Sequence, residues 1–399
     1  MFKFHTICRA CSNPDLKPVF SLGVQPLANS FRTKNEEQTG FAPLEVLWCP
    51  VCSLAQLSVV VSPEILYSKN YPYITSRSET MQRHFESLWR SIRGQCQAES
   101  VVEIGSNDGY FLQFCKQHGA EAVLGIDPAQ NLQPDHAESG VISVCGMFDE
   151  TSTAIARTAM PSVSVIVARH VFCHANDWSG FIRNLDTLSN RDTLVAIEVP
   201  YLVDTLARVE FDQMYAEHLS YLSIKAMTAL LEHSTFRLQK VMRFPIHGGS
   251  IVLFLRRKDH PSEPDPSVQE FLNAETITLD TWRTFSETAH ERIKRLSGLV
   301  KMALASSKIV GFGASAKSTV WISACEFTSR DILFIVDETP QKQGKCSPGT
   351  DIPIVPESEL TPAKANYAIN FAWNFSEIII AKNQKFIDGG GAFLNPHGV

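Results

Sequence analysis

Between residue 100 and about residue 245, short runs of β-branched and aliphatic residues alternate with segments whose apolar residues recur every three or four positions. The runs are VVEIG, AVLGID, VISVCG, VSVIVARH, TLVAIEVP and RLQKVMRFP. Segments between them, such as YFLQFCKQHG and WSGFIRNLDTLS, have the spacing of amphipathic helices. Because strands that alternate with helices pair in parallel, we predict a parallel, doubly wound α/β sheet, with HGGSIVLFLRRK at 247–258 as an additional strand.

The same pattern restarts in the C-terminal third of the chain. Residues 259–267, DHPSEPDPS, are polar and rich in proline and are typical of a linker. A long helix is predicted from about 268 to 305, and KIVGFGASAK, DILFIVDETP, IPIVP and YAINFAWNF then repeat strand, glycine turn and strand. The restart predicts a second, smaller Rossmann-like domain.

The N-terminal 60 residues hold only short apolar runs, which are broken by Asn-Pro, Leu-Gly and Cys-Pro. Such a segment cannot build a large core and needs a covalent or metal staple. A helix is predicted over about 75–95, where Ser78 is a candidate N-cap. The apolar residues at helical spacing in it are Met81, Phe85, Leu88, Trp89 and Ile92.

Four of the ten cysteines supply that staple, as Cys8-x2-Cys11 and Cys49-x2-Cys52. In a reducing compartment, two such hooks favour a tetrahedral Zn²⁺ site over disulfides. All four positions are filled by protein, so we expect the metal to fold the segment and not to do chemistry. A DNA-binding finger is the alternative, but the intervening GVQPLANSFRTKNEEQTG has few basic residues and no finger helix pattern.

We therefore expect a zinc-binding domain over 1–70, a middle domain over 71–245 and a C-terminal Rossmann-like domain over 246–399. A chain of 399 residues is long enough for two or three such cores. With 36 basic and 42 acidic residues the net charge is −6, and no basic run indicates nucleic acid or membrane as a partner. No stretch approaches 18 uninterrupted apolar residues, so we expect a cytoplasmic protein. We also expect a monomer or weak oligomer that acts on a small molecule.

The first glycine turn carries the strongest chemical signal. In VVEIGSNDG, a buried strand leads into Gly105–Gly109, and the next strand ends at Asp127, about 20 residues on. This E-x-G-x-x-x-G turn resembles motif I of class I S-adenosylmethionine (SAM) dependent methyltransferases, and Asp127 resembles their ribose-binding acid. The resemblance implies a SAM site; a different nucleotide is the alternative, and Met147 and Phe148 could equally be plain core. The implied cofactor-binding residues are Glu103, Gly105, Asn107, Asp108, Gly109, Asp127, Met147 and Phe148.

Two further segments concentrate groups that can handle protons. FDQMYAEHLSYLS at 211–223 would, if helical, bring Tyr215 and His218 to one face, although such a segment can also be a surface helix. ARHVFCHAND follows the strand VSVIV, where the ligand crevice of a parallel sheet opens. There His170 and His174 are four residues apart and could form a metal pair, but no third ligand is evident. We therefore favour a pocket role for His174, whereas His170 could be a packed histidine.

Taken in order, CRAC…CPVC, GVQPLANSF, NYPYITS, EIGSNDG, the histidine-bearing loop, YAEHLSY, HGGS, GFGASAK and FAWNF resemble the sugar C-methyltransferases of deoxysugar pathways. The resemblance covers nearly the whole chain. It implies an N-terminal zinc-binding domain, a central SAM domain and a C-terminal Rossmann-like domain. It also implies methylation of a carbon in a nucleotide-linked keto sugar.

The resemblance further implies roles for individual residues. His218 would be the base that removes a proton beside a ketone, and Glu217 its orienting or proton-sharing partner. Tyr215 and His174 would hold the enolate oxygen or the sugar hydroxyls, and Tyr73 of NYPYITS would close the pocket, with Tyr71 as a competitor.

The second glycine turn supplies the candidate substrate-binding residues. In GFGASAK, backbone amides near Gly313 and the amine of Lys317 could hold a diphosphate at a helix N-terminus; a structural turn with a solvated lysine is the alternative. Ser250 of HGGS is a further candidate.

The loop RHVFCH departs from the NNVLAH typical of the family and leaves the acceptor open. A keto group on a natural-product intermediate is therefore an alternative acceptor. A zinc-dependent binding module without catalysis is a third, remote alternative.

Overall fold

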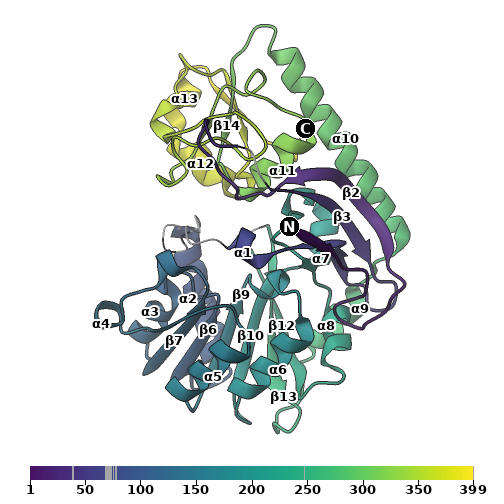
Figure 1. Ribbon diagram of the computed structural model, residues 1–399, viewed down its shortest axis with the longest axis vertical. Helices are drawn as coiled ribbons and strands as arrows, with labels where there is room; N and C mark the ends of the chain where they lie inside the picture. The colour runs from purple at the N-terminus through teal and green to yellow at the C-terminus, as the bar shows by residue number, and fades with distance from the viewer. Residues whose placement is uncertain (38–39, 68–73, 75, 77–78, 247, 399) are drawn as a thin grey trace.

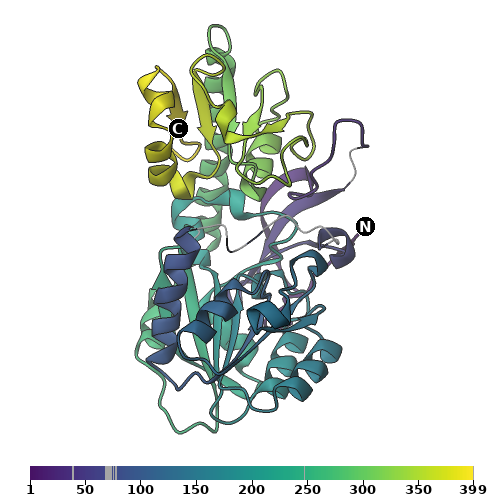
Figure 2. The same ribbon diagram turned by 90° about the vertical axis from the view of Figure 1, so that its left-hand side faces the viewer.

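The computed structural model describes residues 1–37, 40–67, 74, 76, 79–246 and 248–398. A middle domain and a C-terminal domain are joined by the long helix α10 (Leu279–Ala303), and the strands of the N-terminal domain lie beside both (Figures 1 and 2). Within the described residues no helix is both long enough and apolar enough to cross a membrane.

The middle domain is built on a seven-stranded sheet in the order β12-β13-β10-β9-β6-β7-β8. Every pair from β10 to β8 is parallel, whereas β13 runs antiparallel to both of its neighbours. The strands are β6 (Ser100–Ile104), β7 (Ala122–Asp127), β8 (Ile142–Cys145), β9 (Val165–Arg169), β10 (Leu194–Pro200), β12 (Phe236–Phe244) and β13 (Ser250–Arg257).

All the strands predicted for this domain are present, but the sheet is mixed and not wholly parallel because of β13. The expected domain boundary at residue 246 falls inside this sheet, which runs on to Arg257. The stretch 259–267 also stays on the domain, since the Asp265 amide donates to the Gln239 carbonyl of β12 at 2.7 Å.

Helices cover both faces of the sheet, as the nearly continuous apolar runs of its central strands require. On one face, Val102 and Ile104 of β6 belong to a core shared with α5, α6 and α8; on the other, Val101 belongs to a core shared with α2 and α3. The helices are α2 (Glu79–Arg93), α3 (Tyr110–Gln117), α4 (His136–Ser139), α5 (Glu150–Ala159), α6 (Trp178–Leu188), α7 (Leu202–Arg208), α8 (Ile224–Leu231) and α9 (Ser267–Ala274).

The single helix predicted over about 268–305 is wrong: α9 ends at Ala274 and α10 begins at Leu279. The cause is Glu275, which is 3 % exposed and turns its carboxylate to the first amides of α8, accepting from Ile224 at 2.5 Å and from Lys225 at 3.0 Å. Thr278 then begins α10 with a capping box.

The N-terminal domain forms a four-stranded sheet in the order β11-β4-β3-β2 and a smaller antiparallel pair, β1-β5. Strand β11 comes from the middle of the chain, so this sheet is not made by residues 1–70 alone. The elements are β1 (Phe2–Phe4), β2 (Lys17–Pro26), β3 (Phe41–Trp48), β4 (Ala55–Leu57), β5 (Val59–Val61), α1 (Pro63–Leu66) and β11 (Ser220–Tyr221). The candidate cap Ser78 lies outside the described residues.

The C-terminal domain is the predicted second Rossmann-like unit, a five-stranded parallel sheet in the order β16-β15-β14-β17-β18. Its elements are β14 (Ile309–Phe312), α11 (Ala316–Ala324), β15 (Ile335–Val336), β16 (Ile354–Val355), β17 (Tyr367–Asn370), α12 (Ser376–Lys382), α13 (Gln384–Asp388) and β18 (Ala392–Leu394).

Asp212 joins the middle and C-terminal domains. Its side chain is fully buried, and Oδ2 accepts hydrogen bonds from the indole nitrogens of Trp321 at 3.1 Å and Trp373 at 2.7 Å, with His397 Nε2 at 3.2 Å. Burial by itself would raise the pKa of Asp212, but His397, Lys317 and the Trp373 donor together hold it below its ordinary value. The carboxylate is therefore charged and acts as a shared acceptor.

We predict that Asp212→Ala lowers the urea midpoint of unfolding, followed by tryptophan fluorescence. Each buried donor left without an acceptor costs about 1–3 kcal/mol. Asp212→Asn keeps one acceptor oxygen and should lose less, and Asp280→Ala, whose side chain is 80 % exposed, should change nothing. Equal midpoints for Asp212→Ala and Asp280→Ala would contradict this account.

Candidate active site

The predicted turn lies at the carboxyl end of β6, where a parallel sheet opens to ligands. Gly105, Asn107 and Gly109 all have left-handed backbones, with φ of +72°, +53° and +70°. A Cβ at Gly105 would lie only 3.1 Å from the side chain of Val171, so glycine also permits the close approach of the loop after β9.

Asp127 is the last residue of β7 and supports this turn directly. Its Oδ2 accepts from the Asn107 amide and its Oδ1 from the Ala129 amide, both at 2.8 Å. Burial raises the pKa of Asp127, opposed by these two amide donors. Each carboxylate oxygen has a second lone pair, so Asp127 can still accept hydrogen bonds from ribose hydroxyls.

Glu103 and Arg169 form an ion pair beneath the turn. Glu103 is fully buried, and its Oε1 accepts from Arg169 Nε at 2.8 Å and Nη2 at 2.5 Å. The guanidinium lies 4.4 Å from the ring centre of Phe85 and 4.7 Å from that of Phe111. Burial raises the pKa of Glu103 to about 7 in spite of Arg169. Glu103 thus supports the turn from inside the core, and Arg169 faces this core.

The remaining predicted cofactor residues lie around the same crevice. Asp108 accepts from the Ser76 and Tyr110 amides at 3.2 and 3.4 Å. Met147 is 42 % exposed in the loop after β8, and the Gly146 amide bonds the Asp127 carbonyl at 3.0 Å. Phe148 packs edge-on against Phe181 at 4.8 Å. Met147 is therefore placed to meet a ligand, whereas Phe148 is largely packed in the core.

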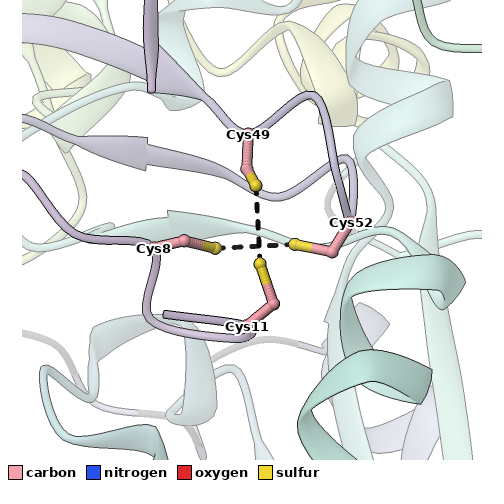
Figure 3. Close-up of side chains that lie close together, drawn as sticks. All are labelled: Cys8, Cys11, Cys49 and Cys52. Carbon is pink, nitrogen blue, oxygen red and sulfur yellow. Dashed lines mark hydrogen bonds between the residues drawn. The ribbon is translucent and has the colours of Figure 1, made fainter. Parts of the chain in front are cut away.

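The four hook cysteines converge on one point, as Figure 3 shows. The Cys8 and Cys52 sulfurs are 3.5 Å apart and those of Cys11 and Cys49 3.6 Å. Thiolates around a tetrahedral zinc, with Zn–S of about 2.3 Å, lie about 3.8 Å apart. The residues therefore fit the structural Zn²⁺ predicted from the sequence, which would supply a crosslink between the two hooks.

The segment 211–223 is not the helix that the sequence allowed. It forms a 3₁₀ turn (Phe211–Gln213), a tight turn and strand β11, because β11 pairs with β4. The tight turn still brings the predicted partners together: Tyr215 Oη lies 2.6 Å from His218 Nε2. His218 Nδ1 lies 2.8 Å from the Gln213 carbonyl, so Nδ1 carries the proton and Nε2 has the lone pair.

His174 faces this pair from the loop after β9, where it ends a 3₁₀ turn (Phe172–His174). Its ring centre is 5.1 Å from that of His218, and its Nδ1 lies 2.8 Å from Tyr67 Oη. Burial lowers the pKa of His174 to about 4, so the imidazole is neutral at neutral pH. Tyr67 was not anticipated from the sequence, and the predicted Tyr73 and its competitor Tyr71 lie outside the described residues.

Glu217 is held by the N-terminal domain. Its carboxylate is buried, and the Asn29 amide nitrogen donates to both oxygens, at 3.0 and 2.7 Å. Burial raises the pKa of Glu217 to about 7, and the Asn29 bond opposes this rise. The orientation of His218 therefore comes from the Gln213 carbonyl, while Glu217 is fixed by Asn29. The only sequence signal for Asn29 was its place in GVQPLANSF.

Arg9, between the first two zinc-site cysteines, ties the N-terminal domain to the same region. It is 7 % exposed, and its guanidinium donates to Asn176 Oδ1 at 3.3 Å and to the Leu219 carbonyl at 3.5 Å. Its own amide bonds the Gln56 side chain at 3.0 Å. The zinc hook thus contacts both segments that carry the histidines.

The second glycine turn repeats the arrangement of the first. Gly313 has φ of +87°; the Ala314 amide donates to Asp337 Oδ2 and the Thr339 amide to Asp337 Oδ1, both at 2.8 Å. Lys342 Nζ lies 3.6 Å from that carboxylate. Asp337 and Lys342 were not anticipated from the sequence, although Asp337 directly follows the second strand of its unit, close to the position that Asp127 has in the first.

The other two predicted substrate residues lie elsewhere. The Lys317 amine is buried 4.3 Å from the Trp373 ring centre, and the charges of Asp212 and Glu210 partly offset the lowering of its pKa by burial. Ser250 is 1 % exposed, and its hydroxyl bonds the Ile246 carbonyl at 3.2 Å. Both side chains therefore lie within the protein and not on the turn at Gly313.

The sheet order, the glycine turn and Asp127 together define a class I SAM-dependent methyltransferase. Three family models match the chain: a zinc binding domain at residues 8–67, a methyltransferase domain at 75–241 and a C-methyltransferase C-terminal domain at 245–397. The chain is 32 % identical to the C-methyltransferase NovU of Streptomyces niveus over 98 % of its own length and 94 % of that protein. It belongs to the C-methyltransferase family and is a SAM-dependent C-methyltransferase.

Two similar solved structures each match less than half of the chain. A methyltransferase in complex with the Haloferax volcanii Trm112 activator has a TM-score of 0.36 and 11 % identity, over 47 % of this chain and 96 % of that one. Magnesium protoporphyrin IX methyltransferase from Synechocystis PCC 6803, with bound SAM, has a TM-score of 0.32 and 13 % identity, over 44 % and 79 %.

We predict that Asp127→Ala weakens SAM binding by roughly 10- to 100-fold in calorimetry, because a hydrogen bond to a charged group contributes about 1.5–3 kcal/mol. Asp127→Asn keeps one acceptor and should lose less. Asp192→Ala, whose side chain is 83 % exposed, is the matched control and should bind as the wild type does. An unchanged affinity in Asp127→Ala would exclude the ribose role.

Zinc content gives a second prediction. Cys11→Ser should lower bound zinc from one ion per chain to a small fraction, measured by atomic absorption, and should lower the midpoint of thermal unfolding because metal binding and folding are coupled. Cys145→Ser, at an exposed thiol outside the cluster, should change neither. Full zinc occupancy in Cys11→Ser would contradict the four-thiolate site.

Proposed function

We propose that the methyl acceptor is a carbon next to the ketone of a nucleotide-linked deoxysugar, and that it reacts as an enolate. The observation that carries the proposal is the pairing of Tyr215 with His218 Nε2 at 2.6 Å, opposite the neutral imidazole of His174. Methyl transfer to oxygen or nitrogen needs no C–H bond to be deprotonated, whereas transfer to a carbon next to a ketone does.

The loop after β9 connects these groups to the cofactor turn. Val171 packs against Gly105, and the His174 amide donates to the Val171 carbonyl at 3.0 Å. His174 is therefore three residues from Val171, which lines the SAM crevice. This short connection supports a reaction between a methyl donor in the crevice and an acceptor held by the histidines.

In the proposed reaction His218 Nε2 takes the proton from the carbon beside the ketone, and the C–H electron pair becomes the enolate. The Tyr215 hydroxyl, which lies on His218 Nε2 without substrate, would turn to the enolate oxygen or a neighbouring hydroxyl, and neutral His174 would bind there too. Glu217, with its pKa near 7, is a buried acid that Asn29 keeps in place for proton sharing. SAM, held by the turn at Gly105–Gly109 and by Asp127, would supply the methyl group to the acceptor carbon, with S-adenosylhomocysteine as the leaving group.

The nucleotide half of the substrate is proposed for the C-terminal domain. Its turn matches the cofactor turn in detail: an acid at the end of the second strand accepts two backbone amides, and a glutamine six residues on, Gln133 or Gln343, donates to the carbonyl of that acid at 2.9 Å in both domains. The amides near Gly313 and the Lys342 amine are the groups suited to a nucleoside diphosphate.

A keto group on a natural-product intermediate is the second candidate acceptor. It was motivated by the unusual loop RHVFCH, but Arg169 of that loop pairs with Glu103 inside the core and so does not favour it. Calorimetry with a nucleoside diphosphate separates the two: no binding would favour the non-sugar acceptor. Failure to bind SAM would instead revive the third alternative, a zinc-dependent binding module.

We predict that incubation with SAM and a panel of nucleotide-linked keto sugars adds one methyl group to a sugar carbon, detected by mass spectrometry and NMR. His218→Asn should lower kcat by roughly 10²- to 10⁴-fold, because general-base catalysis contributes about that much. Its affinity for SAM should not change. The exposed His233→Asn is the control.

Two results would contradict the proposal. One is methylation found only on oxygen or nitrogen, and the other is carbon methylation that survives in His218→Asn at the wild-type rate.

A further inference from the structure

A thiol lies beside the two imidazoles of the proposed active site. Cys173, His174 and His218 each offer a ligand atom, and these atoms lie within 4.8 Å of one another. Cys173 is 1 % exposed, and its Sγ lies 3.7 Å from the His170 carbonyl in the same loop. Of the histidine pair considered from the sequence, only His174 belongs to this group; Cys173 and His218 complete it, and His170 is not part of it.

The chemistry of this triad selects a class of metal. One thiolate and two imidazoles suit Zn²⁺ and similar borderline or soft ions, whereas Mg²⁺ and Ca²⁺ prefer oxygen ligands. Three protein ligands leave a fourth position open, unlike the closed site of four cysteines. We propose that Cys173, His174 and His218 form a second site for Zn²⁺ or a chemically similar ion, and that occupation of this site blocks methyl transfer.

The surroundings of the histidines favour metal binding. The Gln213 carbonyl accepts from His218 Nδ1, so a metal would bind Nε2, in place of the Tyr215 hydroxyl that lies 2.6 Å from it. An imidazole held at its other nitrogen by a carbonyl is the arrangement usual for metal ligands. Tyr67 fixes the Nδ1 side of His174 in a similar way. Ligand atoms around tetrahedral zinc lie about 3.3–3.8 Å apart, so a shift of about 1 Å, within reach of side-chain rotation, closes the site.

Binding has a defined chemical balance and a defined consequence. A metal–sulfur bond replaces the S–H bond of Cys173, and the proton passes to solvent. The metal also takes the Nε2 lone pair of His218, which the proposed reaction needs for the acceptor proton. The inhibition rests on the proposed function, whereas the binding itself does not.

The binding test uses the intact protein with its structural zinc in place. Cd²⁺ is titrated in while the thiolate-to-cadmium absorption in the ultraviolet is recorded, and zinc released into solution is measured in parallel. We expect one equivalent of Cd²⁺ to bind without zinc release. Cys173→Ala and the closer isostere Cys173→Ser should lose this equivalent, and Cys145→Ala, at an exposed thiol, should keep it.

The activity test uses Zn²⁺ as inhibitor. Cys173→Ala should keep the basal rate and SAM affinity of the wild type, and the Zn²⁺ concentration needed for half inhibition should rise at least 10-fold. The site is excluded if Cys173→Ala retains the extra equivalent, or if cadmium uptake is matched by released zinc. Lack of turnover on every nucleotide sugar would refute the proposed function, and the cadmium titration would still decide the metal site.

Discussion

The pairing of strand β11 with strand β4 is the contact on which the arrangement of the proposed active site depends. It draws the segment from Phe211 to Tyr221 out of the middle domain and onto the N-terminal sheet. Within those residues, Asp212 binds two tryptophans of the C-terminal domain, and Glu217 binds Asn29 of the N-terminal domain. His218 faces His174 of the middle domain. Groups from all three domains therefore meet along one short stretch of chain.

This arrangement lets the zinc site position the residues of the proposed active site without itself taking part in the proposed reaction. The hooks fix Arg9, whose guanidinium reaches Asn176 and the carbonyl of Leu219, on the two segments that carry the histidines. A small domain with little core of its own can position these groups only if it is rigid, and the metal crosslink supplies that rigidity. The proposed second metal site would have the opposite effect. A metal bound there would occupy His218, the proposed base, whose position the first metal site helps to fix.

At the proposed SAM site, the buried charges are already compensated by protein groups in the absence of the ligand. Asp127 is anchored by two amides and keeps lone pairs for a ribose, while Glu103 beneath it is balanced by Arg169. Removing only one partner of such a buried pair is costly, because the other charge is left uncompensated. Asp337 repeats the anchoring by two amides, but with Lys342 close to it, so the two turns suit different ligands.

The sequence by itself determined the parts of this protein that depend on local periodicity and spacing. Alternating strands and helices, two glycine turns, the acid Asp127 of the first turn and two CxxC hooks indicate three units and the SAM and zinc sites, because each signal is local in the chain. Only the tertiary structure decided that residues 220–221 leave a helical pattern to join a distant sheet and that Glu275 ends one helix and caps another. It also decided that Asn29 binds Glu217 and that Cys173 lies at the histidines. These outcomes follow from contacts between residues far apart in the chain, whose energy outweighs local preference and leaves no periodic trace in the sequence.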